Sequence, residues 1–100
     1  MMNEFLIGGF AKSIAGHDSG QYYVIINLDD EYAYLVDGKI RTLDRPKKKK
    51  RKHIILPEQF DPELSDKMIR QTIKNEEIKR AIKLLMRNQE FNCEAGKEDK

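Results

Sequence analysis

The 100-residue sequence contains a single cysteine and no long apolar run. Cys93 has no second thiol with which to form an intramolecular disulfide or hold a metal cluster, so redox and zinc functions are poorly supported. The longest apolar run, residues 22–26, is far shorter than the roughly 20 residues that a helix needs to cross a bilayer. The residues after Met1 also lack the pattern of a signal peptide. We therefore expect a soluble, cytoplasmic protein with no membrane partner.

Length and composition favour one small domain, or one domain with a tail. Hydrophobic residues make up 39% of the chain and charged residues 36%, which allows a core but only a thin one. Ser19 lies beside His17 and Asp18 on one short loop, a poor match to a catalytic serine with a histidine base. His17 and His53 are too few to hold a metal without cooperating carboxylates. We expect no enzymatic activity, no cofactor and no small-molecule substrate.

Positive and negative charge are separated along the chain, although the net charge is only +2. Residues 1–38 hold six acids against one base, whereas residues 39–53 hold nine bases against Asp44 alone. Residues 54–100 are nearly balanced. Six consecutive cations at 47–52 repel one another, so this segment favours an anionic partner that neutralises it.

The first 57 residues read as short strands, because β-branched and aromatic residues recur in runs bounded by Gly, Asp or Pro. Asp37-Gly38 is the best local signal, since a two-residue hairpin turn needs positive φ at both central positions. It predicts pairing of residues 32–36 with residues 39–43. Five short strands with tight turns suggest a small barrel. The expected strands are residues 10–14, 22–26, 32–36, 39–43 and 53–56.

Helical signals follow Pro57. Asp61, Pro62 and Glu63 give an N-cap, a proline at the first helical position and an acid in the first turn. Asn75, followed by two acids, predicts a second cap and an amphipathic helix. The expected division is a barrel over residues 1–57 with a basic connector at 39–53, a helical extension over 58–90, and a flexible tail over 91–100.

The loop after the first strand carries a resemblance to a known motif. Gly8, Ala15-Gly16, Asp18 and Gly20 resemble the KOW motif, a strand–loop–strand element of ribosomal proteins and NusG-type transcription factors. Asp37-Gly38, Arg41 and the lysine-rich stretch 46–53 extend the likeness to bacterial KOW-domain RNA-binding proteins, which are related to a eukaryotic and archaeal large-subunit ribosomal protein. The resemblance covers roughly residues 6–56, about half the chain. It implies an SH3-like β-barrel, followed here by one or two α-helices, that binds structured RNA, in particular ribosomal RNA, without catalysis.

The lysine run is the strongest functional feature, because each neutralised phosphate releases condensed counterions. Engagement of about six to eight cations predicts a slope of log affinity against log salt of order −4 to −7. The run contains no aromatic residue and so offers no stacking platform, which favours recognition of backbone and shape. Stacking on bases is one reading of Tyr22, Tyr23, Tyr32 and Tyr34, but aromatic residues of small barrels are mostly core, so packing is the expectation, with Tyr23 or Tyr32 partly exposed. Asp18 is expected to brace its loop by bonding backbone amides. The candidate RNA-binding residues are Lys12, His17, Ser19, Lys39, Arg41, Arg45, Lys47, Lys48, Lys49, Lys50, Arg51, Lys52 and His53.

Two other functions remain open at this point. Residues 46–52 match a nuclear address by composition, although a segment between two strands is hard to present to a transport receptor. A protein-interaction adaptor built on the barrel is the second alternative, with the basic run contacting acidic protein. A membrane-surface role lacks an adjacent insertion helix with aromatic anchors. The apolar stripe at 78–85 is expected to dock on its own domain, and the oligomeric state is left open.

Overall fold

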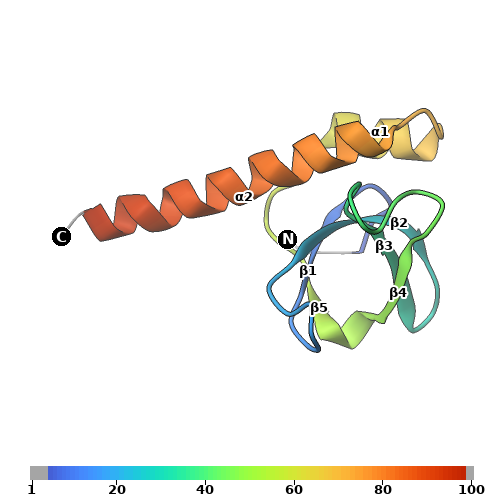
Figure 1. Cartoon of the computed structure of the whole chain (residues 1–100), viewed down its shortest axis with the longest axis horizontal. Helices are drawn as coiled ribbons and strands as arrows, with labels where there is room; N and C mark the ends of the chain where they lie inside the picture. The colour runs from blue at the N-terminus through green and yellow to red at the C-terminus, as the bar shows by residue number, and fades with distance from the viewer. Residues whose placement is uncertain (1–4, 99–100) are drawn as a thin grey trace.

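The computed structural model describes the backbone of residues 5–98 and the side chains of residues 5–87. It is a mainly β fold followed by two helices, as the sequence predicts (Figure 1). The elements in chain order are β1 (Phe10–Ser13), β2 (Tyr22–Leu28), β3 (Tyr32–Val36), β4 (Lys47–Lys50), the 3-10 helix η1 (Arg51–His53), β5 (Ile54–Ile55), α1 (Pro62–Ile69) and α2 (Asn75–Glu98).

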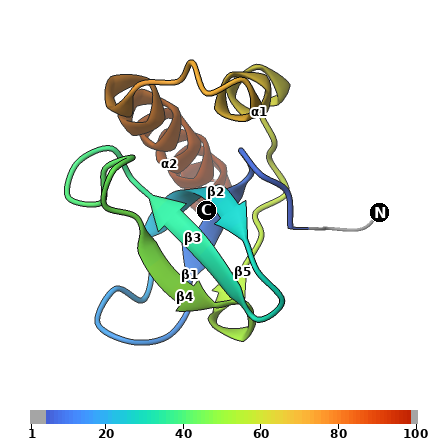
Figure 2. The same cartoon turned by 90° about the vertical axis from the view of Figure 1, so that its right-hand side faces the viewer.

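The five strands form one antiparallel sheet in the order β4-β3-β2-β1-β5. The sheet curls so that its two edge strands approach each other, and the three-residue η1 joins them (Figure 2). Within the described residues no ladder connects β4 to β5, so hydrogen bonding does not close the sheet. Four of the predicted strands are found, the one expected at 53–56 being shortened to Ile54–Ile55.

The predicted strand at 39–43 is wrong, and so is the two-residue hairpin. The Asp37 carboxylate accepts hydrogen bonds from the backbone amides of Lys39 and Arg41, both at 2.9 Å. The carbonyl oxygen of Arg41 accepts in turn from the amides of Asp37 and Gly38. These bonds close the segment into a local loop, in which Gly38 has the expected positive φ. The partner of β3 is instead β4, the lysine run itself, which is therefore a strand rather than a connector.

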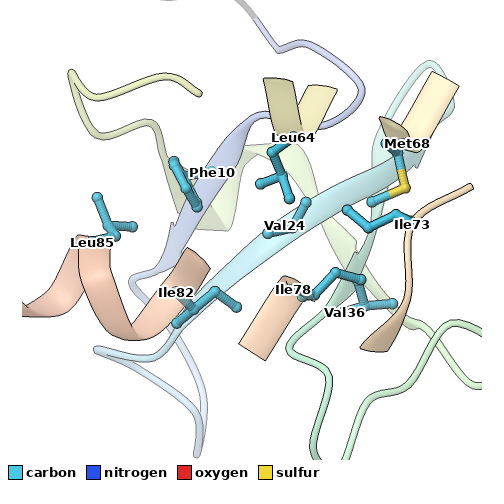
Figure 3. Packing of buried hydrophobic residues seen from close by; sticks show 9 residues of the cluster. All are labelled: Phe10, Val24, Val36, Leu64, Met68, Ile73, Ile78, Ile82 and Leu85. Atoms are coloured by element: carbon cyan, nitrogen blue, oxygen red, sulfur yellow. The ribbon is translucent and has the colours of Figure 1, made fainter. Parts of the chain in front are cut away.

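Each face of the sheet packs against its own hydrophobic cluster, because successive side chains of a strand point to opposite faces. The inner cluster is enclosed by the curled sheet and contains Ala11, Tyr23, Ile25, Ala33, Leu35 and Ile54. The outer cluster joins the sheet to the helices (Figure 3) and contains Phe10, Val24, Val36, Leu64, Met68, Ile73, Ile78, Ile82 and Leu85. The sheet and the two helices thus share the outer cluster.

Both helices begin where the sequence predicts. The Asp61 side chain accepts from the amides of Glu63 and Leu64, which confirms the N-cap of α1. The cap proposed at Asn75 is wrong in detail, because Asn75 is the first helical residue and its Oδ1 accepts from the amide of Leu43 at 2.9 Å. The backbone of α2 continues past the predicted end at residue 90, to Glu98.

Candidate nucleic-acid interface

The four lysines of β4 alternate between two environments. Lys47 and Lys49 are half-buried, whereas Lys48 and Lys50 are exposed. This alternation follows from strand geometry, which sends neighbouring side chains to opposite faces. The run that reads as one block of charge in the sequence is therefore two pairs of lysines with different surroundings.

The inward pair is held by the carboxylate of Asp18 in the loop between β1 and β2. Lys49 Nζ lies 2.9 Å from Asp18 Oδ1 and donates a second hydrogen bond to the Ala15 carbonyl oxygen. Lys47 Nζ lies 3.2 Å from Asp18 Oδ2. The side chains of Asp18 and Lys49 are only 12% and 11% exposed, so solvent screens this contact weakly. The network ties the loop to the edge strand β4.

Two hydroxyl groups complete the coordination of Asp18. Ser13 Oγ donates to Oδ1 and the Tyr23 hydroxyl donates to Oδ2, both at 2.9 Å. Burial raises the pKa of Asp18, but the hydrogen bonds from Lys49, Tyr23, Ser13 and Lys47 outweigh it and hold the pKa far below its ordinary value. Asp18 braces its loop as expected, but the expected backbone-amide donors are wrong, because among the described residues the donors to its carboxylate are side chains.

The outward lysines share their face with two tyrosines of β3. Tyr32 pairs with Lys50 across the ladder and Tyr34 pairs with Lys48. Lys48 Nζ also lies over the Tyr32 ring, 4.4 Å from its centroid, a cation–π geometry. Both tyrosines are only half-buried, which agrees with the partial exposure expected of Tyr32 but makes the core prediction wrong for Tyr34, whereas Tyr23 is buried.

The sequence raised these two tyrosines as base-stacking residues but left them out of the candidate site, and the register of β4 shows what that choice lacked. Residues 47–50 contain only lysine, and the aromatic side chains beside them come from β3 through the ladder. In residues 32–36, Tyr32, Tyr34 and Val36 alternate with Ala33 and Leu35, but the sequence predicts that residues 39–43 form the strand that pairs with them. The correct register would have set each tyrosine opposite a lysine.

Three further candidates, Arg51, Lys52 and His53, follow β4 along the same edge of the sheet. Arg51 and Lys52 follow β4 directly in η1, with Lys52 exposed. The Arg51 guanidinium carbon lies 5.1 Å from the centroid of the Phe5 ring, and its buried Nε has no hydrogen-bond partner among residues 5–98. His53 is half-buried, and its carbonyl oxygen accepts from the amide of Ile14.

Other predicted residues lie at either side of this edge. His17 and Ser19 are exposed and flank Asp18, so the network of that carboxylate brings them to the side of β4. Lys39 and Arg45 are exposed in the loop between β3 and β4, beside the start of α2, and Arg41 is half-buried there. Lys12 is set apart on β1, with its Nζ 5.4 Å from the Tyr22 ring centroid.

Acidic residues border the basic edge on one side. Asp29, Asp30 and Glu31 are exposed in the turn between β2 and β3, and the Glu31 carbonyl oxygen accepts from the amide of Arg51. An anionic ligand is therefore repelled from this turn while it is attracted to the exposed lysines.

Comparison with known proteins adds no assignment to this geometry: no family model matches the chain, and no curated protein does either. Within residues 5–98, none of the helices has the length and apolar character that crossing a membrane requires. The described side chains form no group of three or more metal-ligating residues.

Proposed function

We propose that this protein is an RNA-binding module that contacts the phosphates of structured RNA, with ribosomal RNA as the expected target. The observation that carries the proposal is the edge strand β4, where Lys48 and Lys50 extend into solvent and Lys52 follows them in η1. Lysine suits this role because its ammonium is a compact charge on a flexible stem, which follows a phosphate backbone without one fixed geometry.

The two pairs of lysines have different roles in this proposal. Lys47 and Lys49 pair with Asp18 and fix the position of the strand. The outward cations remain available for phosphate, so fewer cations engage RNA than the sequence alone suggests. Each contact releases counterions, which makes the affinity salt-dependent.

The KOW relationship and the SH3-like barrel belong to the same proposal. They are supported by the curled five-stranded sheet, by the short η1 that joins its edge strands, and by the loop of Gly16 and Gly20, both with positive φ. The pairing of β4 with β3 disfavours a nuclear address, because a transport receptor would have to detach a paired strand.

Cosedimentation with ribosomes at low and high salt tests the proposal. The outward-lysine variant, Lys48→Gln/Lys50→Gln/Lys52→Gln, is expected to lose most of the sedimenting fraction. The matched control variant, Lys74→Gln/Lys79→Gln/Lys83→Gln, removes the same charge from exposed positions beside and on α2 and should sediment like the wild type. Partners that copurify equally after ribonuclease digestion would contradict RNA binding and favour the adaptor.

A further inference from the structure

The outward side of β2, β3 and β4 carries a second kind of chemistry beside the lysines. Asn27 pairs with Tyr34, which pairs with Lys48, so an amide, an aromatic ring and an ammonium group lie in one row across three strands. Tyr32 and Lys50 form the next row. All five side chains are exposed or half-buried. We call this set, Asn27, Tyr32, Tyr34, Lys48 and Lys50, the tyrosine face.

The helices cover only part of this side of the sheet. Val24 and Val36 lie on it and are fully buried under α1 and α2. Figure 2 shows both helices lying across one end of the sheet, while β3 and β4 run on beyond them. The uncovered part of the sheet is the part that carries the tyrosine face.

Local hydrogen bonds orient the groups of this face. The Tyr34 hydroxyl donates to Asp29 Oδ2 at 3.2 Å, and this hydrogen bond fixes the orientation of the Tyr34 ring. Asn27 Oδ1 accepts from the amide of Leu28 at 2.9 Å, and because the side chain is exposed, its NH₂ group can donate to a ligand. Lys48 lies over the Tyr32 ring and is free to move from the ring to a phosphate, because its stem is flexible and exposed.

We propose that the tyrosine face binds unpaired nucleotides of RNA, with bases stacked on Tyr32 and Tyr34 and phosphates held by Lys48 and Lys50. Asn27 donates to the edge of a stacked base. This inference rests on the proposed RNA binding and specifies its target as a loop, bulge or strand end. Unpaired bases suit such a face because they can be splayed onto aromatic rings, whereas bases in a duplex cannot.

Charge determines how the bound RNA strand is oriented on the tyrosine face. Asp29 follows β2, which flanks β3 on the side opposite β4, and its carboxylate lies beside the Tyr34 hydroxyl, whereas the lysines of β4 lie on the other side of β3. Phosphates are therefore directed toward β4, and bases toward β2. An acidic peptide would be attracted to the lysines, but it has no group that needs two aromatic rings to bind.

The test compares three RNA ligands of about ten nucleotides by fluorescence anisotropy: a single strand with bases, the same strand with abasic sites, and a duplex. The wild type is expected to bind the strand with bases about tenfold more tightly than the abasic strand, the size of one base–aromatic stack. Equal affinity for these two strands would overturn this inference and leave phosphate binding standing. Absence of binding to all three would overturn the proposed function as well.

Variants of the two tyrosines assign the effect to the rings. Tyr32→Leu/Tyr34→Leu keeps apolar packing but removes the aromatic faces, and is expected to abolish the preference for bases while duplex affinity changes less than about twofold. Tyr32→Phe/Tyr34→Phe should keep the preference. The control Tyr22→Leu removes another half-buried tyrosine beneath a lysine, away from this face, and should also keep it. A leucine variant that melts cooperatively and retains the full preference would contradict the assignment.

Discussion

One carboxylate, Asp18, holds the two inward lysines of β4 and two hydroxyl groups from the sheet. A run of cations would repel itself out of a regular strand, and the acid opposite its inner face compensates for that repulsion. The same contact joins the loop between β1 and β2 to the edge strand. Asp18 is therefore a structural residue that lies inside the proposed binding region.

Replacement of Asp18 by Asn should destabilise the protein strongly. The variant leaves Lys47 and Lys49 without their counter-charge in a largely buried place, and we expect a loss of about 3 kcal/mol in the free energy of unfolding. Urea denaturation followed by circular dichroism measures it. Asp30→Asn, in an exposed turn, is the control and should change little. A loss in Asp18→Asn no larger than about 0.5 kcal/mol would contradict the role of this carboxylate.

The pH dependence of stability follows from the same residue. Folding lowers the pKa of Asp18, so the folded state binds the proton more weakly than the unfolded chain. The stability that Asp18 contributes is complete above about pH 5 and is lost as the pH falls through the unfolded pKa of about 3.9 toward the folded one. The difference in unfolding free energy between the wild type and Asp18→Asn should shrink in that window. A difference that stays constant down to about pH 2 would disprove this linkage.

Two glycines with positive φ allow the sheet to approach the helices closely. A Cβ on Gly8 would overlap the backbone of Ser65 in α1, and a Cβ on Gly38 would overlap the backbone of Asn75 and Lys79 in α2. Ser65 Oγ also donates to the carbonyl oxygen of Ile7 at 2.7 Å. The close approach of α1 leaves no room for a side chain at Gly8, which is the physical reason for glycine there.

Gly38→Ala should destabilise the fold by at least about 2 kcal/mol, because it adds a clash with α2 to the strain of a positive φ. Gly20→Ala is the matched control, since Gly20 has a similar φ but nothing within 4 Å of the added methyl group. It should lose only about 1 kcal/mol. Equal losses in thermal or urea unfolding would show that the contact with α2 contributes nothing.

Prediction from sequence succeeded where local signals agree with the tertiary structure. Asp61 and Pro62 start α1, and the apolar run at 32–36 gives β3 with its predicted bounds. Prediction from sequence failed where a contact between distant residues determines the structure. Four lysines have little preference for a strand by themselves, and β4 exists because it pairs with β3 and faces Asp18. The tyrosines of β3 were left out of the candidate site because aromatic residues of small barrels usually pack in the core, and the wrong register concealed their position opposite the lysines.

The whole molecule is built around two apolar clusters, of which the outer one needs both the strands and the helices. Phe10, Val24 and Val36 from the sheet pack against side chains of α1 and α2. A chain of residues 1–57 would expose this surface to water, and small folds have little stability to spare. We expect that chain to lack a cooperative thermal transition, whereas residues 1–87 retain one, because the described buried residues end at Leu85. Cooperative unfolding of residues 1–57 alone would refute the shared core.

Positive and negative charges occupy separate regions of the molecule, so the net charge does not describe its surface. The net charge of +2 conceals a basic edge strand, with an acidic turn at 29–31 on one side of it. Only part of that edge is free, because Asp18 already pairs with the inward lysines. The central claim is that the outward cations Lys48, Lys50 and Lys52 are the ones that meet phosphate.

The salt dependence of RNA affinity tests this claim most directly. Log affinity is measured against log salt from about 50 to 300 mM for the wild type, the outward-lysine variant and the control variant at positions 74, 79 and 83. Each lost phosphate contact flattens the slope by about 0.7 to 0.9, so the outward-lysine variant should flatten it by about 2 to 3 and the control should leave it unchanged. Equal slopes for all three proteins, or equal flattening in both variants, would contradict the claim.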